Sequence, residues 1–133
     1  HSDTGMIPLT RLATRNSVPV AKFISEERMD ELKQATKVGG ATLTKLLGTS
    51  AWYAPGAAVS AMVQAIANDS NKMFPCSTML DGEYGLNDIC IGVPVLIGRN
   101  GIEQIVEIDL SDSEKSELAT SAEAVRATNG LLS

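Results

Sequence analysis

The stretch Ile89-Cys90-Ile91-Gly92-Val93-Pro94-Val95-Leu96-Ile97 decides the fold, because every second residue in it is apolar and β-branched. That alternation is typical of a β-strand with one buried face. Asn100-Gly101 follows, and this dipeptide is a strong short-range signal of a hairpin. Residues 102–110 then return with apolar side chains at most alternate positions, so we predict two antiparallel strands. Gly92 and Pro94, on the other phase, indicate a bulge or an edge strand.

Three more segments are expected to be extended. Residues 6–14 fit a strand, in which Pro8 again indicates an edge or a bulge. Residues 18–24 fit a short extended piece. Residues 73–80 alternate weakly and lead into the turn signal Asp81-Gly82.

Three helices are expected. Ser25 is a good N-cap for a helix that ends at Gly48 and is weakened or bent at Gly39-Gly40. Residues 55–68 form a second helix that is apolar nearly all round, which predicts burial on several sides. Ser111 and Glu114 have the spacing of a capping box at the start of a third helix.

The order of strands, helices, strands and a final helix predicts an α+β fold. We expect an antiparallel twisted sheet with helices packed on one face. The chain has 133 residues, which suits one domain over 1–133.

Composition excludes several classes of function. The formal net charge is −5 and no basic run occurs, so nucleic acid is not an expected partner. The least polar stretch, Ala51 to Ala67, is too short and too interrupted to span a bilayer. Cys76 and Cys90 are expected to be buried thiols in a reduced, cytoplasmic setting, where a disulfide is not required. No Cys/His cluster offers a metal site, and no GxGxxG, P-loop, GxSxG or HExxH motif occurs.

Three segments, in this order, together resemble the NAD-dependent L-lactate/malate dehydrogenases, and most closely the lactate-dehydrogenase-like malate dehydrogenases. They are His1-Ser2-Asp3-Thr4-Gly5-Met6-Ile7-Pro8-Leu9, Ser50-Ala51-Trp52-Tyr53-Ala54-Pro55-Gly56-Ala57-Ala58, and Gly82-Glu83-Tyr84-Gly85-Leu86-Asn87-Asp88-Ile89 with its continuation to Gly98. The resemblance implies the substrate-binding, catalytic C-terminal domain of that family. A full member has about twice this length, so the N-terminal Rossmann domain that binds NAD is expected to be absent from this chain.

The resemblance also implies the reaction and its residues. The reaction would convert (S)-malate and NAD⁺ to oxaloacetate and NADH, with His1 as proton acceptor and donor. An imidazole suits that proton transfer because its unperturbed pKa is about 6.5. Ala51 would line the substrate pocket and Pro55 would pack near the nicotinamide, although both also fit a simple helix entry. A terminal histidine by itself usually has no chemical role, and only the residues after His1 favour this one.

Other readings stay open. L-lactate or another 2-hydroxy acid is an alternative substrate, because the deciding residue would lie upstream of this chain. The expected partners are a small 2-hydroxy or 2-oxo dicarboxylic acid, the chain's own Rossmann domain, and further copies in a homodimer or homotetramer. The isolated chain is expected to be inactive. A function of another class, a stand-alone oligomerisation or binding module, would use the apolar helix at 55–68.

Overall fold

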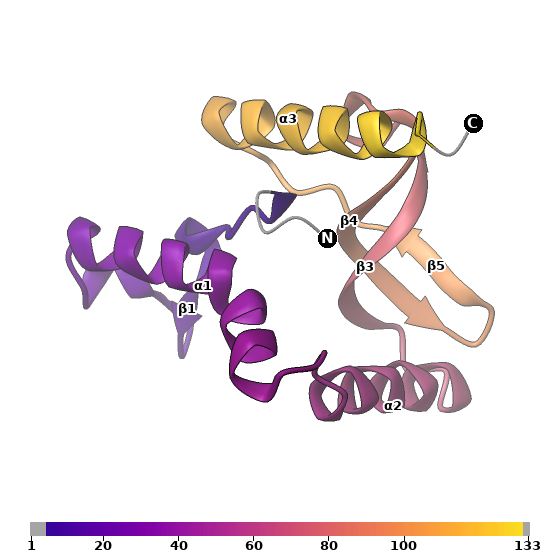
Figure 1. Cartoon of the computed structure of the whole chain (residues 1–133). Helices are drawn as coiled ribbons and strands as arrows, with labels where there is room; N and C mark the ends of the chain where they lie inside the picture. Colours follow the sequence, from indigo (N-terminus) through magenta and orange to yellow (C-terminus); the bar gives the residue numbers. More distant parts are fainter. Residues whose placement is uncertain (1–4, 132–133) are drawn as a thin grey trace. The chain divides into compact units, whose positions relative to one another are not determined.

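The computed structural model describes residues 5–131, which divide into two compact units (Figure 1). One unit contains the chain up to Ser50 together with Ser111–Ser121. The other contains Ala51–Leu110 together with the residues from Ala122 onward. Helices and antiparallel strands make up both units, so the α+β fold class is confirmed.

The second unit is built on a three-stranded antiparallel sheet in the order β3-β4-β5 (Figure 1). The strands are β3 (Lys72–Asp81), β4 (Asn87–Gly98) and β5 (Gly101–Ile105). One face of β4 is buried as predicted, with Ile89, Ile91, Val93, Val95 and Ile97 all between 0 and 7% exposed. Leu80 of β3 pairs with Ile89 and is fully buried, so this face is the core of the unit. The other face is open, since Met73 and Met79 are each 55% exposed.

The bulge predicted at Gly92 and Pro94 is absent, because β4 pairs regularly with β3 through both residues. The alternative prediction, an edge, holds at these two positions, because β5 pairs with the central strand β4 only from Val95 onward. The register shifts lie instead at Leu80/Asp81 and Leu96/Ile97. Pairing with β5 reaches only to Val95, so the N–H that Pro94 lacks falls beyond the paired part of β5. The Pro94 carbonyl still accepts a hydrogen bond of 2.8 Å from the Val106 amide.

The predicted hairpin is present, but its loop lies one residue earlier than the Asn100-Gly101 signal indicates. Gly98 pairs with Gly101, which leaves Arg99-Asn100 as the two-residue loop. Gly101 has a φ of 98°, a conformation that glycine adopts without strain. The Asn100 amide groups both donate to Glu103 Oε1 at 3.0 Å. The return strand ends at Ile105, where the alternation of apolar residues breaks, and is shorter than the predicted 102–110.

Tyr84 ties the β3–β4 connection to the chain that follows β5. It lies in a short 3₁₀ helix, η4 (Glu83–Gly85), with a φ of 54°. Its hydroxyl donates to the Val106 carbonyl at 2.8 Å and accepts from the Ile108 amide at 3.0 Å. Its own amide donates to Glu107 Oε2 at 2.7 Å. Burial raises the pKa of the Tyr84 phenol and outweighs the opposing hydrogen bond from Ile108, so the hydroxyl stays protonated and can donate.

Helix α2 (Tyr53–Ala67) confirms the second predicted helix and corrects its burial. It packs against β4, yet only Ala65 is buried, at 3% exposed. Val59 and Val63 are 59% and 56% exposed, and Trp52 just before the helix is 68% exposed. The helix is therefore covered on one side only in this chain. The prediction of burial on several sides is therefore wrong for the described chain, which supplies cover for one side of the helix only.

In the first unit, the predicted strand over residues 6–14 is wrong. The chain instead forms a 3₁₀ turn, η2 (Thr10–Leu12), because the amides of Thr10 and Leu12 bond to the nearby carbonyls of Pro8 and Leu9. The short extended piece predicted at 18–24 is reduced to β2 (Val18–Pro19), followed by η3 (Val20–Lys22). β2 pairs with β1 (Thr14–Arg15) in a two-stranded ladder.

Helix α1 (Glu26–Leu47) begins and ends as predicted. The Ser25 hydroxyl accepts from the Arg28 amide at 3.3 Å, which is an N-cap contact. Gly48 ends the helix in the left-handed region with a φ of 68°. The helix is continuous through Gly39-Gly40, so the helical hydrogen bonds outweigh the low helix propensity of two glycines. Its axis changes direction partway along, in line with the predicted bend (Figure 1).

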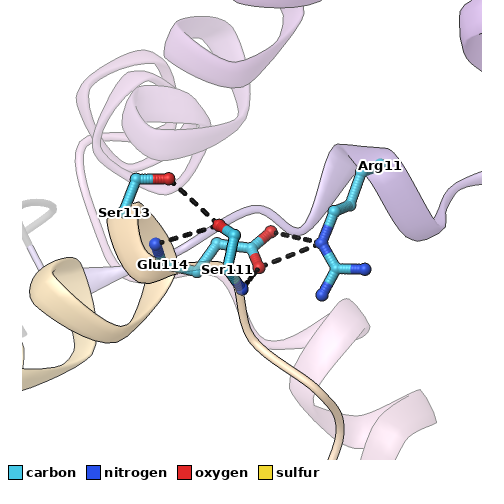
Figure 2. A network of polar contacts seen from close by, with 4 residues as sticks. All are labelled: Arg11, Ser111, Ser113 and Glu114. Atoms are coloured by element: carbon cyan, nitrogen blue, oxygen red, sulfur yellow. Dashed lines mark hydrogen bonds and ion pairs between the residues drawn. The ribbon is translucent and has the colours of Figure 1, made fainter.

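Helix α3 (Asp112–Asn129) starts with the predicted capping box, extended by an arginine (Figure 2). The Glu114 amide donates to Ser111 Oγ at 3.3 Å, and the Ser111 amide donates to Glu114 Oε2 at 2.8 Å. Arg11 Nε lies 3.0 Å from both carboxylate oxygens of Glu114. Desolvation alone would raise the pKa of Glu114, but the hydrogen bonds from the Ser111 amide and Arg11 together lower it.

This network predicts an acid-sensitive contribution to stability. The folded-state pKa of Glu114 lies below its ordinary value of 4.5, so the contribution is present above pH 4.5 and is lost as the pH falls through the lowered folded-state value. Glu114→Gln should lower the free energy of unfolding by about 0.5–1 kcal/mol near neutral pH. Urea unfolding from about pH 3 to about pH 7 measures this, with Glu123→Gln on the exposed side of α3 as the control. A gap between Glu114→Gln and the parent that stays constant down to the acid end would show that the charge is not its source.

Both cysteines are free, with Cys76 half-buried and Cys90 exposed. The expectation that both thiols are buried is therefore wrong for Cys90, because it lies on the open face of β4 opposite Met79. Between residues 5 and 131, no helix has the length and apolar character needed to cross a membrane.

Candidate active site

The three predicted site residues fall in different parts of the chain. His1 lies outside the described residues, which begin at Gly5. Ala51 is half-buried and comes just before helix α2, and Pro55 is the third residue of that helix and exposed. The structure therefore brings Ala51 and Pro55 to the same end of one helix.

The start of α2 is shaped by the residues between Ala51 and Pro55. The Gly56 amide donates to the Trp52 carbonyl at 2.8 Å, which is the first bond of the helix. Pro55 fits here because a proline in the first turn removes an N–H that has no helical partner. No side chain caps this end, and no charged residue occurs from Ala51 to Ala67. The helix dipole therefore leaves a partial positive charge beside Ala51, which favours an anionic neighbour.

Gly5, the first described residue, is held by a side chain that the sequence did not single out. Ser121, on helix α3, is 8% exposed, and its hydroxyl donates to the Gly5 carbonyl at 3.0 Å. A Cβ on Gly5 would lie 3.3 Å from the same hydroxyl oxygen, so the two groups approach closely. The signal for Ser121 in the sequence is weak, because a serine inside a helix is usually solvent-exposed.

One shallow hollow of about 400 Å³ occurs in the second unit, away from the predicted site residues. It is lined by Met79, Asp88, Ile89, Cys90, Arg126 and Asn129. The Arg126 guanidinium donates to the Asn87 carbonyl at 2.6 Å, so this cation is already engaged. The hollow contains neither Ala51 nor Pro55. Within the described part of the chain, no group of three or more His, Cys, Asp or Glu side chains could hold a metal ion.

Comparison with known proteins gives a consistent result. The family described as lactate/malate dehydrogenase, alpha/beta C-terminal domain, matches residues 1–129. A malate dehydrogenase of Bacteroides thetaiotaomicron is 63% identical over 132 residues, which is 99% of this chain and 42% of that protein. The malate dehydrogenase structure from Salinibacter ruber superposes with a TM-score of 0.94 at 45% identity, covering 99% of this chain and 43% of that one.

A lactate dehydrogenase structure from Eimeria maxima, solved with NADH and oxamate, also superposes, with a TM-score of 0.92 at 36% identity. It covers 97% of this chain, and this chain covers 42% of it. The chain thus spans less than half the length of the proteins that it resembles.

Proposed function

The chain belongs to the lactate/malate dehydrogenase family as its α/β C-terminal domain, and we propose that it works as the C-terminal part of a malate dehydrogenase. The intact enzyme would interconvert (S)-malate plus NAD⁺ and oxaloacetate plus NADH. The 63% identity to a malate dehydrogenase along nearly the whole chain carries this proposal. The lactate dehydrogenase at 36% identity makes L-lactate the less favoured substrate.

His1 is the proposed proton acceptor and donor. Oxidation of a 2-hydroxy acid moves a hydride from carbon to the nicotinamide and a proton from the hydroxyl oxygen to a base. An imidazole near its ordinary pKa of about 6.5 can take that proton and return it in the reverse direction. The match of the family to residues 1–129 includes this histidine and supports its role.

Ala51 and Pro55 are the proposed substrate and nicotinamide contacts. Their position at one helix end supports this pairing, because a pocket there could be lined by both. The small side chain of Ala51 leaves room for a substrate, and the uncapped helix end favours a carboxylate nearby. Trp52 and Tyr53, at 68% and 88% exposed, offer apolar surface for the rest of the enzyme.

NAD is the proposed cofactor, held mainly by an N-terminal Rossmann domain. This chain contains no GxGxxG motif that could cradle a dinucleotide. The Eimeria lactate dehydrogenase with NADH supports the choice of cofactor. A homodimer or homotetramer is proposed for the assembly. The proposed setting is the cytoplasm, where the free thiols of Cys76 and Cys90 would persist.

The proposal that NAD is bound by the N-terminal domain and the proton is transferred by this chain can be tested directly. The purified 133-residue chain should show no malate-dependent reduction of NAD⁺, because it lacks a dinucleotide site, whereas the intact enzyme should turn over under the same conditions. NADH absorbance measures both, with L-lactate as the second substrate. Turnover by the chain alone would overturn this division. Faster turnover of lactate than of malate by the intact enzyme would overturn the choice of substrate.

A further inference from the structure

We propose that Asn100 is a site of spontaneous deamidation and that the Glu103 carboxylate slows this reaction. The modification would change the β4–β5 hairpin and is independent of the proposed dehydrogenase activity. Water is its only co-reactant, so it needs no partner protein and no cofactor. Three features of the hairpin support it: the glycine that follows Asn100, the exposure of the loop, and the hydrogen bonds that Glu103 accepts.

The reaction begins when the Gly101 amide nitrogen attacks the side-chain carbonyl carbon of Asn100. A new N–C bond forms, the bond from that carbon to Nδ2 breaks, and ammonia leaves with the amide proton of Gly101. The product of this step is a cyclic succinimide. Water then opens the ring at either carbonyl, which gives aspartate in the normal linkage or isoaspartate, whose main chain runs through the side chain. An amide is exchanged for an acid, and nothing is oxidised or reduced.

Asn100 meets the local requirements for this attack. A side chain on the following residue hinders the approach to its amide nitrogen, and Gly101 has none. Apart from its chain neighbours, no described residue has an atom within 4 Å of the position that a Cβ on Gly101 would take. Asn100 itself is exposed in the two-residue loop of the hairpin, so water has access to the ring once it forms.

Glu103 holds the Asn100 carboxamide in a different place. The backbone amide and the Nδ2 group of Asn100 both donate to Glu103 Oε1, each at 3.0 Å. Ring closure requires the side chain to turn until its carbonyl carbon meets the Gly101 nitrogen, and this turn takes Nδ2 away from Glu103. Hydrogen bonds to a carboxylate are stronger than those between neutral groups. Loss of this bond therefore adds to the barrier for deamidation in the folded hairpin.

The other contacts of the loop restrain its backbone only. Gly98 pairs with Gly101, and the Arg99 amide donates to Asp69 Oδ1 at 2.8 Å. Neither contact involves the Asn100 side chain. Glu103 is thus the residue whose removal frees the carboxamide while these backbone contacts remain.

Either product would loosen the hairpin. Aspartate at position 100 has no Nδ2 to donate, and it would bring a second carboxylate to the place where an amide nitrogen now lies 3.0 Å from Glu103 Oε1. Isoaspartate lengthens the main chain by one carbon between residues 99 and 101, which disturbs the pairing of Gly98 with Gly101. The modification would therefore act at the end of the sheet where β4 turns into β5.

The test follows deamidation in the folded chain at mildly alkaline pH. The tryptic peptide 100–115 reports on Asn100 through its mass and through separation of its aspartyl and isoaspartyl forms. Glu103→Ala should raise the rate at Asn100 by about 5-fold, the factor expected for loss of one such hydrogen bond. Glu103→Gln keeps an oxygen acceptor and should stay close to the parent. Gln104→Ala, which changes the adjacent exposed side chain, is the matched control and should leave the rate unchanged.

The second Asn-Gly pair, Asn129-Gly130, serves as an internal reference in the tryptic peptide 127–133. The Gly130 amide donates to the Arg126 carbonyl at 2.9 Å, at the end of helix α3. Its rate should be the same in the parent and in every Glu103 variant, and an equal rise at both sites in Glu103→Ala would contradict the proposal. Glu103→Asp, whose carboxylate is one methylene shorter, should also speed the reaction at Asn100 and decides the matter if Glu103→Ala does not fold.

Measurement in urea separates the effect of the fold from that of the local sequence. With the hairpin unfolded, the parent and Glu103→Ala should deamidate at Asn100 at equal rates. The role of Glu103 is overturned if the folded Glu103→Ala chain reacts no faster than the folded parent, or if the difference between them persists in urea. Absence of aspartate and isoaspartate at position 100 from every variant would reject the site itself. None of these outcomes bears on the proposed dehydrogenase activity, which is measured separately by NADH absorbance.

Discussion

His1→Ala in the intact enzyme should lower the rate of hydride transfer by about 10²- to 10⁴-fold, the usual range for loss of a general acid–base group. The reason is the proton on the substrate hydroxyl. Without a base in reach, hydride loss from carbon would leave a high-energy protonated carbonyl. Binding of NAD⁺ should change little, because the proposed dinucleotide site lies in the other domain.

Single-turnover kinetics of NADH formation measure this loss without interference from slow product release. The pH profile gives a second readout: the step in kcat/KM near the ordinary histidine pKa of about 6.5 should disappear in His1→Ala. Met6→Ala is a suitable control, since Met6 is 50% exposed and lies in the same segment. A rate within a few-fold of the parent in His1→Ala would remove the histidine from the mechanism.

The elements that sequence alone predicts well are those decided by neighbouring residues. The capping box at Ser111 and Glu114 needs only residues three apart, and both of its hydrogen bonds form. The buried face of β4 follows from strict alternation over nine residues. The hairpin follows from a short turn signal, although its exact loop depends on the register with β5.

The elements that sequence predicts poorly depend on distant partners. Residues 6–14 alternate like a strand, but in the described part of the chain only Thr14 pairs with another strand, so local turns at Pro8 and Leu9 prevail. Pro94 indicates an edge or a bulge, and only the observed pairing shows that it is an edge, because β5 ends just before it. In both cases the deciding fact is which strands lie alongside, and this information is not contained in the local pattern.

The candidate site likewise includes residues that the sequence predicts and features that it does not. The resemblance predicts Ala51 and Pro55 as site residues, and the structure puts them at one helix end. It gives no signal for Ser121, whose partner is 116 residues away. The apolar character of α2 is plain in the sequence, but its exposure is not, because what covers a helix depends on chains or domains beyond the sequence at hand.

Leu80→Ala should be the most destabilising single change among the core residues of the sheet, lowering the free energy of unfolding by about 2–5 kcal/mol. Leu80 is fully buried and pairs with Ile89, which is 1% exposed. The change removes apolar contacts and leaves a cavity against β4, whose pairing with β3 is continuous from Ile89 to Ile97. Such a strand cannot easily move to fill the space. Urea unfolding of the chain gives this loss as a lower midpoint with an unchanged slope.

Met79→Ala is the matched control, because Met79 is the preceding residue on β3 and is 55% exposed on the opposite face. Its loss should be under about 1 kcal/mol, as for most surface substitutions. The contrast tests the register as well as the packing. A slip of β3 by one residue would exchange the faces, burying Met79 and exposing Leu80. Equal losses in the two variants, or a larger loss in Met79→Ala, would therefore contradict the pairing of Leu80 with Ile89 on which the core of this unit depends.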